Sequence, residues 1–325
     1  MKHLAPRTRA RILRCHSLIA RSTVLSRLYL TLCRHLPPLR LPALRRRAIN
    51  IISMINWPAA ALGPRLIHVG RSSEFYLKPH NHEFDIEAVL GGQLSYEPEV
   101  FAFLDKVATS YDTVIEIGAN VGIFTVYFSK RLMTENPNAR IFAFEPSNEA
   151  YKRLRENLEL NGATENVTSF NAAIGVNTGF ARFYEPRGHL TNGSLKISFA
   201  SYFDEHPVSN WIVTLAGSSL LELLSGAERV LLKIDVEGFE AEVLRSLEPI
   251  IVQLRPDILI EVLPGFEDAI SSAIDFAAFG YRFYGLTPDG LRAIDHLRAV
   301  DGRDCFLTTA KDAVAKNPYP DIAGP

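Results

Sequence analysis

The sequence has few cysteines and no apolar run long enough to cross a bilayer. Cys15, Cys33 and Cys305 are odd in number and far apart, so neither a disulfide framework nor a cysteine metal site is indicated. The most apolar early stretch, residues 48–63, is interrupted by Asn50 and Pro58 and is too short to span a membrane. These features favour a reducing compartment, and we expect a cytoplasmic protein.

The first 73 residues also contain no Asp or Glu, although they hold 14 Lys and Arg residues. The rest of the chain has 21 basic and 36 acidic residues, so a basic arm precedes an acidic body. Arginines recur through the apolar part of the arm, which does not fit a secretory signal. The favoured interpretation is a variable arm or a helix packed on the body. Peripheral attachment to an anionic membrane surface, nucleic-acid binding and an organellar transit peptide stay open as alternatives.

The hydrophobic pattern after Tyr111 predicts an α/β fold. Short β-branched runs alternate with longer helical periods, as in a parallel sheet with crossover helices. The two last runs are joined by a loop and should pair antiparallel. We expect a Rossmann-like sheet of seven strands, mostly parallel, with helices on both faces. The expected strands are Thr113–Ile117, Arg140–Phe144, Val167–Ala173, Arg229–Asp235, Asp257–Val262, Tyr281–Leu286 and Arg303–Thr309.

Helices are expected between these strands. One covers residues 121–132, a second runs from a Ser147 cap to Asn161-Gly162, and a third follows Asp235. A fourth has its apolar stripe over residues 266–277 and is closed by Gly280. Residues 174–216 predict hairpins and loops. The expected division is a basic extension over 1–73, one domain over 74–310 and a loose tail over 311–325.

Ligands of open α/β sheets bind beyond the carboxyl ends of the strands. After the first expected strand the sequence reads Glu116-Ile117-Gly118-Ala119-Asn120-Val121-Gly122. Gly118 allows a tight turn with positive φ, and amides at the next helix start can face a carboxylate or phosphate. Taken alone, this run also fits a plain strand-to-helix turn.

The next strand ends add residues suited to a nucleoside ligand. Glu145 follows the second strand, where its carboxylate can accept hydrogen bonds from both ribose hydroxyls. Asn171 and Ala172 follow the third strand, at a position that suits adenine. The glycine spacing G-x-x-x-G differs from the dinucleotide pattern G-x-G-x-x-G, which argues against a nicotinamide enzyme. Glu116, two residues before the first glycine, could instead hold the ammonium group of a methionine moiety.

Lys233, Asp235 and Glu237 lie at the end of the fourth strand, where ionisable groups are costly to bury unless they are paired or functional. We interpret them as carboxylates near an acceptor with a lysine that orients them; a merely supporting network is the alternative. Glu261 ends the fifth strand and should face the same edge. The pair His80-x-His82 lacks further ligands nearby, so no metal site is expected.

In this order the motifs resemble the FkbM-type family of class I S-adenosylmethionine-dependent methyltransferases. The resemblance covers about residues 91–261. It rests on GQLSYEP (92–98), VIEIGANVGIFTVYFSK (114–130), IFAFEPSNEAYKRLRENLELNG (141–162), FNAAIG (170–175), Asn192-Gly193-Ser194 and LLKIDVEGFEAEVL (231–244).

The resemblance implies methyl transfer from S-adenosyl-L-methionine to a hydroxyl of a saccharide or another small metabolite. On this basis Glu116, Gly118, Asn120, Gly122 and Glu145 hold the cofactor, with Asn171 and Ala172. Asp235, Glu237 and Lys233 serve catalysis, and Tyr96, Glu97, Ser194 and Glu261 approach the substrate. The sequence departs from the family pattern at Glu116, where aspartate is commoner. It also departs after Glu261, where Val262-Leu263-Pro264 replaces an expected histidine.

Two other functions stay open. A nucleic-acid methyltransferase could use the basic arm to grip phosphates, but Asp235-Val236-Glu237-Gly238 stands where a base-flipping motif such as N-P-P-[YF] would be expected. A cofactor-binding module could regulate a partner without catalysis, although the complete set of acidic positions argues against lost activity.

Overall fold

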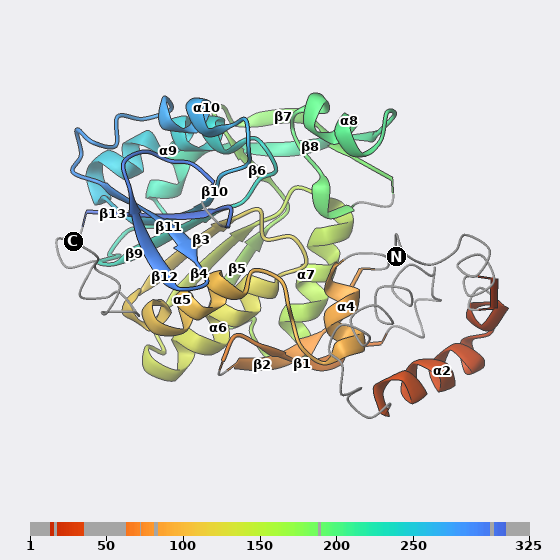
Figure 1. Cartoon of the computed structure of the whole chain (residues 1–325). Helices are drawn as coiled ribbons and strands as arrows, with labels where there is room; N and C mark the ends of the chain where they lie inside the picture. Colours follow the sequence, from red (N-terminus) through yellow and green to blue (C-terminus); the bar gives the residue numbers. More distant parts are fainter. Residues whose placement is uncertain are drawn as a thin grey trace. The chain divides into compact units, whose positions relative to one another are not determined.

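The computed structural model describes residues 14–15, 18–35, 63–71, 73–80, 84–187, 190–299 and 302–309 (Figure 1). The chain divides into two compact units, residues 1–96 and 97–325. The expectations for most of the basic arm, for His82 and for the tail after residue 310 lie outside the described residues. Within the described ranges, no helix combines the length and apolar character needed to cross a membrane.

The described part of the first unit includes a helix, a β-hairpin and a short helix. Buried residues alternate with exposed ones along both strands, so the hairpin buries one face, as an antiparallel pair does when it covers a small core. Residue 65 pairs with 77 and residue 69 with 73. The elements are α2 (Thr23–His35), β1 (Arg65–Val69), β2 (Ser73–Leu77) and α4 (Phe84–Gly91).

The second unit is built around an eight-stranded sheet of order β12-β11-β13-β10-β9-β3-β4-β5 (Figure 1). Strands β10, β9, β3, β4 and β5 pair in parallel, and β11, β12 and β13 pair antiparallel. The strands are β3 (Thr113–Ile117), β4 (Arg140–Phe144), β5 (Val167–Phe170), β9 (Val230–Ile234), β10 (Asp257–Glu261), β11 (Arg282–Thr287), β12 (Gly290–Ile294) and β13 (Asp304–Thr308).

Helices cover both faces of this sheet. In Figure 1, α9 and α10 lie on one side and α5 and α6 on the other. A hydrophobic core cluster joins alternate residues of β3, β4, β9 and β10 to α9. The helices are α5 (Pro98–Val107), α6 (Ile123–Glu135), α7 (Asn148–Leu160), α9 (Glu240–Leu254) and α10 (Glu267–Ser271), with a 3-10 turn η1 (Ala108–Ser110).

An insert between β5 and β9 forms a separate three-stranded sheet of order β6-β8-β7. Its β7 and β8 pair antiparallel, and a short helix connects them. The elements are β6 (Ala173–Gly175), β7 (Gly179–Glu185), η2 (Leu190–Asn192), α8 (Ile197–Phe203), β8 (Val208–Ala216) and η3 (Gly217–Leu221).

The predicted fold class is confirmed, with three differences in detail. The main sheet has eight strands instead of seven, because residues 290–294, expected as loop, form β12. The third strand ends at Phe170, and residues 173–175 join the insert sheet instead. The helix expected over 266–277 ends at Ser271, and a separate turn follows in which Asp275 accepts a hydrogen bond from the Ala278 amide. The Ser147 cap is confirmed by its bond from the Ala150 amide.

Candidate functional site

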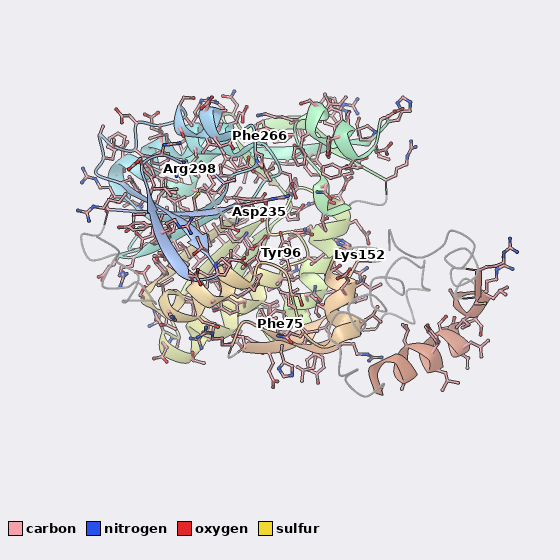
Figure 2. The ribbon with its side chains drawn as sticks, in the orientation of Figure 1. Phe75, Tyr96, Lys152, Asp235, Phe266 and Arg298 are labelled. Atoms are coloured by element: carbon pink, nitrogen blue, oxygen red, sulfur yellow. The ribbon has the colours of Figure 1, made fainter. Side chains whose placement is uncertain are left out.

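The sheet brings the predicted site residues to one edge. Strands β3, β4, β5, β9 and β10 all end there, and β13, which runs the other way, begins there at Asp304. Asp235 follows β9 near the middle of this edge, and Figure 2 labels it together with Phe266 near α10. Residues that are far apart in the chain therefore meet, as the parallel arrangement requires.

The turn after β3 is tied to the neighbouring strand end. The Gly118 amide donates to the Phe144 carbonyl at 2.9 Å, and Gly118 has φ +90°. A Cβ on Gly118 would lie 1.7 Å from the Asp235 carbonyl oxygen, and one on Gly122 would lie 2.4 Å from Leu154 Cδ1. Both glycines therefore let protein elements approach closely: the first admits the end of β9 and the second admits α7.

Glu145, after β4, is oriented by two backbone amides. Its Oε2 accepts from the Asn120 amide and its Oε1 from the Ser147 amide, both at 2.7 Å. Burial raises the pKa of Glu145 to about 7, although these two hydrogen bonds favour the charged form. Asn171 Nδ2 donates to the Glu145 carbonyl at 2.9 Å and to the Pro146 carbonyl at 3.2 Å, so it holds the same turn. Each carboxylate oxygen keeps a lone pair for a further donor.

Glu116 lies inside the unit on the face of β3 that packs toward α6. Its side chain is 1% exposed, and its Oε2 accepts from Thr125 Oγ1 at 2.6 Å. Burial raises its pKa to about 7, while Lys233 and the Thr125 hydrogen bond favour the charged form. Glu116 and Lys233 are register partners in β3 and β9, so both side chains project from the same face.

Lys233 and Asp235 form an ion pair. The distance from Lys233 Nζ to Asp235 Oδ2 is 3.2 Å, and the lysine side chain is 3% exposed against 18% for the aspartate. Burial favours the neutral amine, but Asp235, Glu97 and Glu116 raise the pKa of Lys233 above its ordinary value. The lysine therefore stays charged, and its position 4.2 Å from the centre of the Phe124 ring adds a cation–π contact.

The turn from Val236 to Glu240 has an unusual backbone. Glu237 has φ +54°, which is rare for a residue other than glycine, and Gly238 has φ +89°. Glu240 is fully buried, and its Oε1 accepts from the Val236 and Gly238 amides at 3.2 and 3.1 Å. Burial, followed by the charges of Asp235 and Glu240, raises the pKa of Glu237 to about 9.

Further carboxyl groups border this turn. Burial and the charges of Asp235 and Glu237 raise the pKa of Glu261 to about 10. Arg303 Nη1 lies 3.6 Å from Glu261 Oε1, but the arginine side chain is 63% exposed. Burial and Glu97 raise the pKa of Asp304 well above its usual range. Among the residues that the structure describes, no group of three or more His, Cys, Asp or Glu side chains is arranged to hold a metal ion.

The sequence reasoning missed Asp304 and Glu240. Asp304 begins a strand that was expected to run antiparallel, so its place at the common edge could have been read from the strand direction. Glu240, by contrast, is indistinguishable in the sequence from an exposed acid in the first turn of a helix. Of the four predicted substrate residues, Glu97 raises the pKa of Asp304, and Glu261 has its own pKa raised by Asp235. Ser194 contacts the Glu237 carbonyl. Tyr96 belongs to the first unit, and its role stays a prediction.

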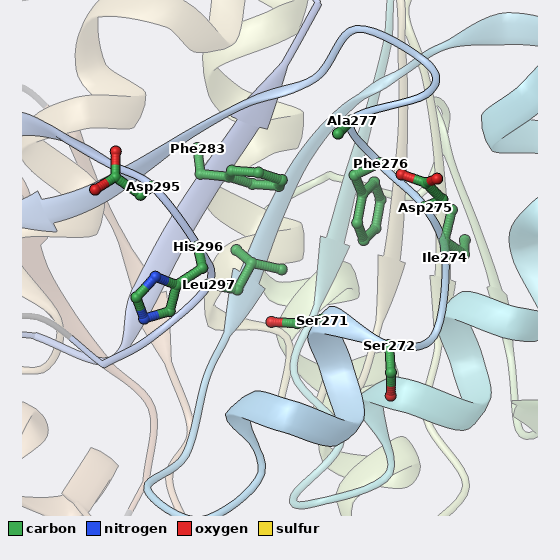
Figure 3. Close-up of a pocket in the computed structure, with 10 residues that line it drawn as sticks. All are labelled: Ser271, Ser272, Ile274, Asp275, Phe276, Ala277, Phe283, Asp295, His296 and Leu297. Atoms are coloured by element: carbon green, nitrogen blue, oxygen red, sulfur yellow. The ribbon is translucent and has the colours of Figure 1, made fainter.

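A pocket of about 340 Å³ lies elsewhere in the second unit. Phe276, Phe283 and Leu297 point into it, and exposed polar side chains surround it (Figure 3). Phe283 on β11 pairs with Leu307 on β13, and Leu307 pairs in turn with Ile258 on β10. Ile258 lies three residues before Glu261, which ends β10 at the site edge. The pocket is therefore about 10 Å along the sheet from the edge that carries the predicted site, and none of the predicted site residues lines it.

A family model described as the methyltransferase FkbM domain matches residues 116–283, just over half of the chain. The match begins at Glu116 on β3 and runs through the turns after β4 and β9. This chain belongs to the FkbM methyltransferase family. Membership of this methyltransferase family implies a methyl donor, and S-adenosyl-L-methionine is the donor expected from the sequence motifs.

Two curated methyltransferases and one solved structure are similar to this chain. The hexuronic acid methyltransferase AglP of Haloferax volcanii is 29% identical over 151 residues, covering 46% of this chain and 56% of that protein. The methyltransferase sdnD of Sordaria araneosa is 26% identical over 172 residues, covering 46% of this chain and 65% of that protein. The chain therefore spans less than two thirds of the length of either relative. A crystal structure of methyltransferase FkbM from Methylobacillus flagellatus KT has a TM-score of 0.37 and 15% identity, over 61% of this chain and 43% of that one.

The residues of this FkbM-family chain fit the cofactor. The Glu145 carboxylate is fixed by two amides with acceptor capacity to spare. Asn120 has φ +50° next to it, and its side-chain oxygen is buried without a hydrogen-bond partner in the described part of the chain. A buried oxygen without a partner is costly, which suits a place where a ligand supplies the donor.

Proposed function

We propose that this methyltransferase transfers the methyl group of S-adenosylmethionine to a hydroxyl of a saccharide or a similar small metabolite. The observation that carries the proposal is the Lys233–Asp235 pair, which keeps a carboxylate partly open to solvent at the sheet edge, next to the turn that fits the cofactor. The name of the hexuronic acid methyltransferase supports a saccharide as the acceptor class.

The cofactor side of the proposed site comprises the ends of β3 and β4. Glu145 would bind the ribose hydroxyls, and Asn120 would accept a hydrogen bond through its free oxygen. Glu116 would attract the ammonium group of the methionine moiety. Gly118 and Gly122 permit the close packing that places these groups, and Asn171 and Ala172 would border the adenine.

The acceptor side comprises the ends of β9 and β10 and the start of β13. Lys233 donates to Asp235 Oδ2, and the other carboxylate oxygen would take the proton of an acceptor hydroxyl. Glu237 and Glu261 have raised pKa values, so at neutral pH both hold a proton and can donate hydrogen bonds to acceptor oxygens. S-adenosylmethionine would supply an electrophilic methyl group bound to a sulfonium sulfur. After transfer of the methyl group, the sulfur compound leaves as a neutral thioether.

Positioning should account for more of the rate than proton transfer. Alignment of two reactants can contribute about 7–11 kcal/mol. A general base typically contributes about 10²–10⁴-fold, or about 3–5 kcal/mol. Loss of the Asp235 carboxylate should therefore reduce the rate strongly without abolishing it.

The test is transfer of an isotope-labelled methyl group from S-adenosylmethionine to a panel of neutral sugars, uronic acids and small hydroxyl compounds, with RNA and DNA tested alongside. We expect wild-type enzyme to label at least one saccharide. We expect Asp235→Asn to lower turnover of that acceptor by about 10²–10⁴-fold while the affinity for S-adenosylhomocysteine is kept. Asp295→Asn, an exposed residue of the distant pocket, is the control and should keep full turnover. Labelling of RNA or DNA but of no small hydroxyl compound would refute the proposal.

A further inference from the structure

A short segment of the insert is attached to the turn that carries Glu237. The Ser194 hydroxyl donates to the Glu237 carbonyl at 2.8 Å and accepts from the Lys196 amide at 3.0 Å. Ser194 is fully buried. Two residues on, Lys196 Nζ forms an ion pair with Glu242 Oε1 at 3.1 Å. The segment from Ser194 to Lys196 therefore holds both the turn and the first turn of α9.

The Glu237 turn requires such support. A left-handed backbone at a residue with a side chain is strained, and it persists only where its surroundings hold it. Glu240 holds the amides on either side, of Val236 and Gly238, but it does not contact the carbonyl of Glu237. Ser194 supplies a donor to that carbonyl. The two contacts together hold the turn from opposite sides.

Ser194 is itself fixed by the insert sheet. Its amide and carbonyl exchange hydrogen bonds with Tyr184 of β7, at 3.0 and 2.9 Å. The preceding residue, Gly193, lies so close to the Phe183 ring that a Cβ there would be 2.6 Å from it. A rigid strand therefore places the hydroxyl, and the hydroxyl places the turn.

We propose that Ser194 is a positioning residue, which fixes the Glu237 turn so that the Glu237 carboxyl group is held at the acceptor side of the site. The proposal rests on the proposed function for the role of Glu237. It differs from the expectation that Ser194 binds the substrate, because its one hydroxyl proton is donated to the Glu237 carbonyl.

The test compares Ser194→Ala, Ser194→Cys and Ser194→Thr with wild type. Cysteine is close in volume but a weak donor, so it reports on the hydrogen bond even if the alanine variant folds poorly, and threonine keeps the hydroxyl. Ser219→Ala is the control, because the Ser219 hydroxyl donates within its own exposed turn, to the Ala216 carbonyl at 2.6 Å. Two readouts need no methyl acceptor. They are hydrogen exchange of the Val236 and Gly238 amides and an NMR titration of the Glu237 carboxyl carbon.

We expect Ser194→Ala and Ser194→Cys to speed exchange of these two amides on the order of tenfold, and the threonine and control variants to match wild type. Burial, Asp235, Glu240 and Glu97 raise the pKa of Glu237 against the lowering effect of Arg303, and this pKa should fall toward its ordinary value as the turn loosens. Unchanged exchange and titration in both variants would overturn the proposal.

Kinetics with an acceptor separate positioning from substrate contact. A positioning role lowers kcat and leaves KM and the affinity for S-adenosylhomocysteine within about twofold. A higher KM with kcat unchanged would make Ser194 a substrate contact and overturn the proposal. If no acceptor were labelled, the proposed function would fail, whereas the exchange and titration results would still decide the role of Ser194 in placing the turn.

Discussion

Replacement of Gly118 by alanine tests whether the cofactor turn and the end of β9 are built as one unit. A Cβ at this position would lie 1.7 Å from the Asp235 carbonyl oxygen, whereas real Cβ atoms essentially never come closer than 3.0 Å. The two backbones would have to separate by about 1.3 Å. Such overpacking costs about 1–3 kcal/mol. The positive φ adds about 1–2 kcal/mol for a residue with a side chain.

Gly265 offers a matched control, because it has the same φ of +90° but nothing within 4 Å of the place a Cβ would take. Gly265→Ala should therefore show the backbone cost alone, about 1–2 kcal/mol. We expect Gly118→Ala to lose at least about 1–3 kcal/mol more in urea denaturation. It should also bind S-adenosylhomocysteine more weakly in calorimetry. Equal stability and equal affinity in the two variants would refute the steric argument.

Two further predictions concern the buried charges. Glu237→Gln should be more stable than wild type at pH 8 by about 1–3 kcal/mol and no more stable near pH 4. The reason is that the raised pKa, about 9 in the folded protein, makes wild-type stability fall as pH rises from the ordinary glutamate value toward 9. A difference that does not change with pH, measured by denaturation at several pH values, would contradict it. Lys233→Met should destabilise the protein by about 3–5 kcal/mol, since Asp235 and Glu116 lose their buried counter-charge. A loss below 1 kcal/mol in the same assay would show that the lysine charge is dispensable.

The sequence was sufficient to predict the sheet and the edge that carries the site residues, because both depend on local patterns. Thr113–Ile117 and Arg140–Phe144 form strands with the expected bounds, since each is a short β-branched or aromatic run with a turn after it. The parallel order then brings Glu145 and Asp235 to one edge without any knowledge of contacts. The family motifs pointed to the same residues.

What the sequence could not show depends on pairing over long distances. Residues 290–294 have no strand pattern of their own in the sequence. They form β12 through their antiparallel pairing with β11. The stripe over 266–277 has helical spacing, but the helix ends at Ser271 and a separate turn begins at Asp275. The contact between Ser194 and Glu237 joins residues 43 positions apart, so no local pattern reports it. The same holds for the approach of Gly118 to Asp235.

If the turns after β3 and β4 hold the methyl donor, removal of the Glu145 carboxylate must weaken binding of S-adenosylhomocysteine. Calorimetric titration of this ligand into wild type and Glu145→Ala tests that role, with Glu159→Ala, an exposed glutamate of α7, as the control. We expect wild type and the control to bind alike. We expect Glu145→Ala to lose at least about tenfold in affinity, as when hydrogen bonds to a charged group are removed. Equal binding by all three proteins, or no binding by wild type, would contradict it.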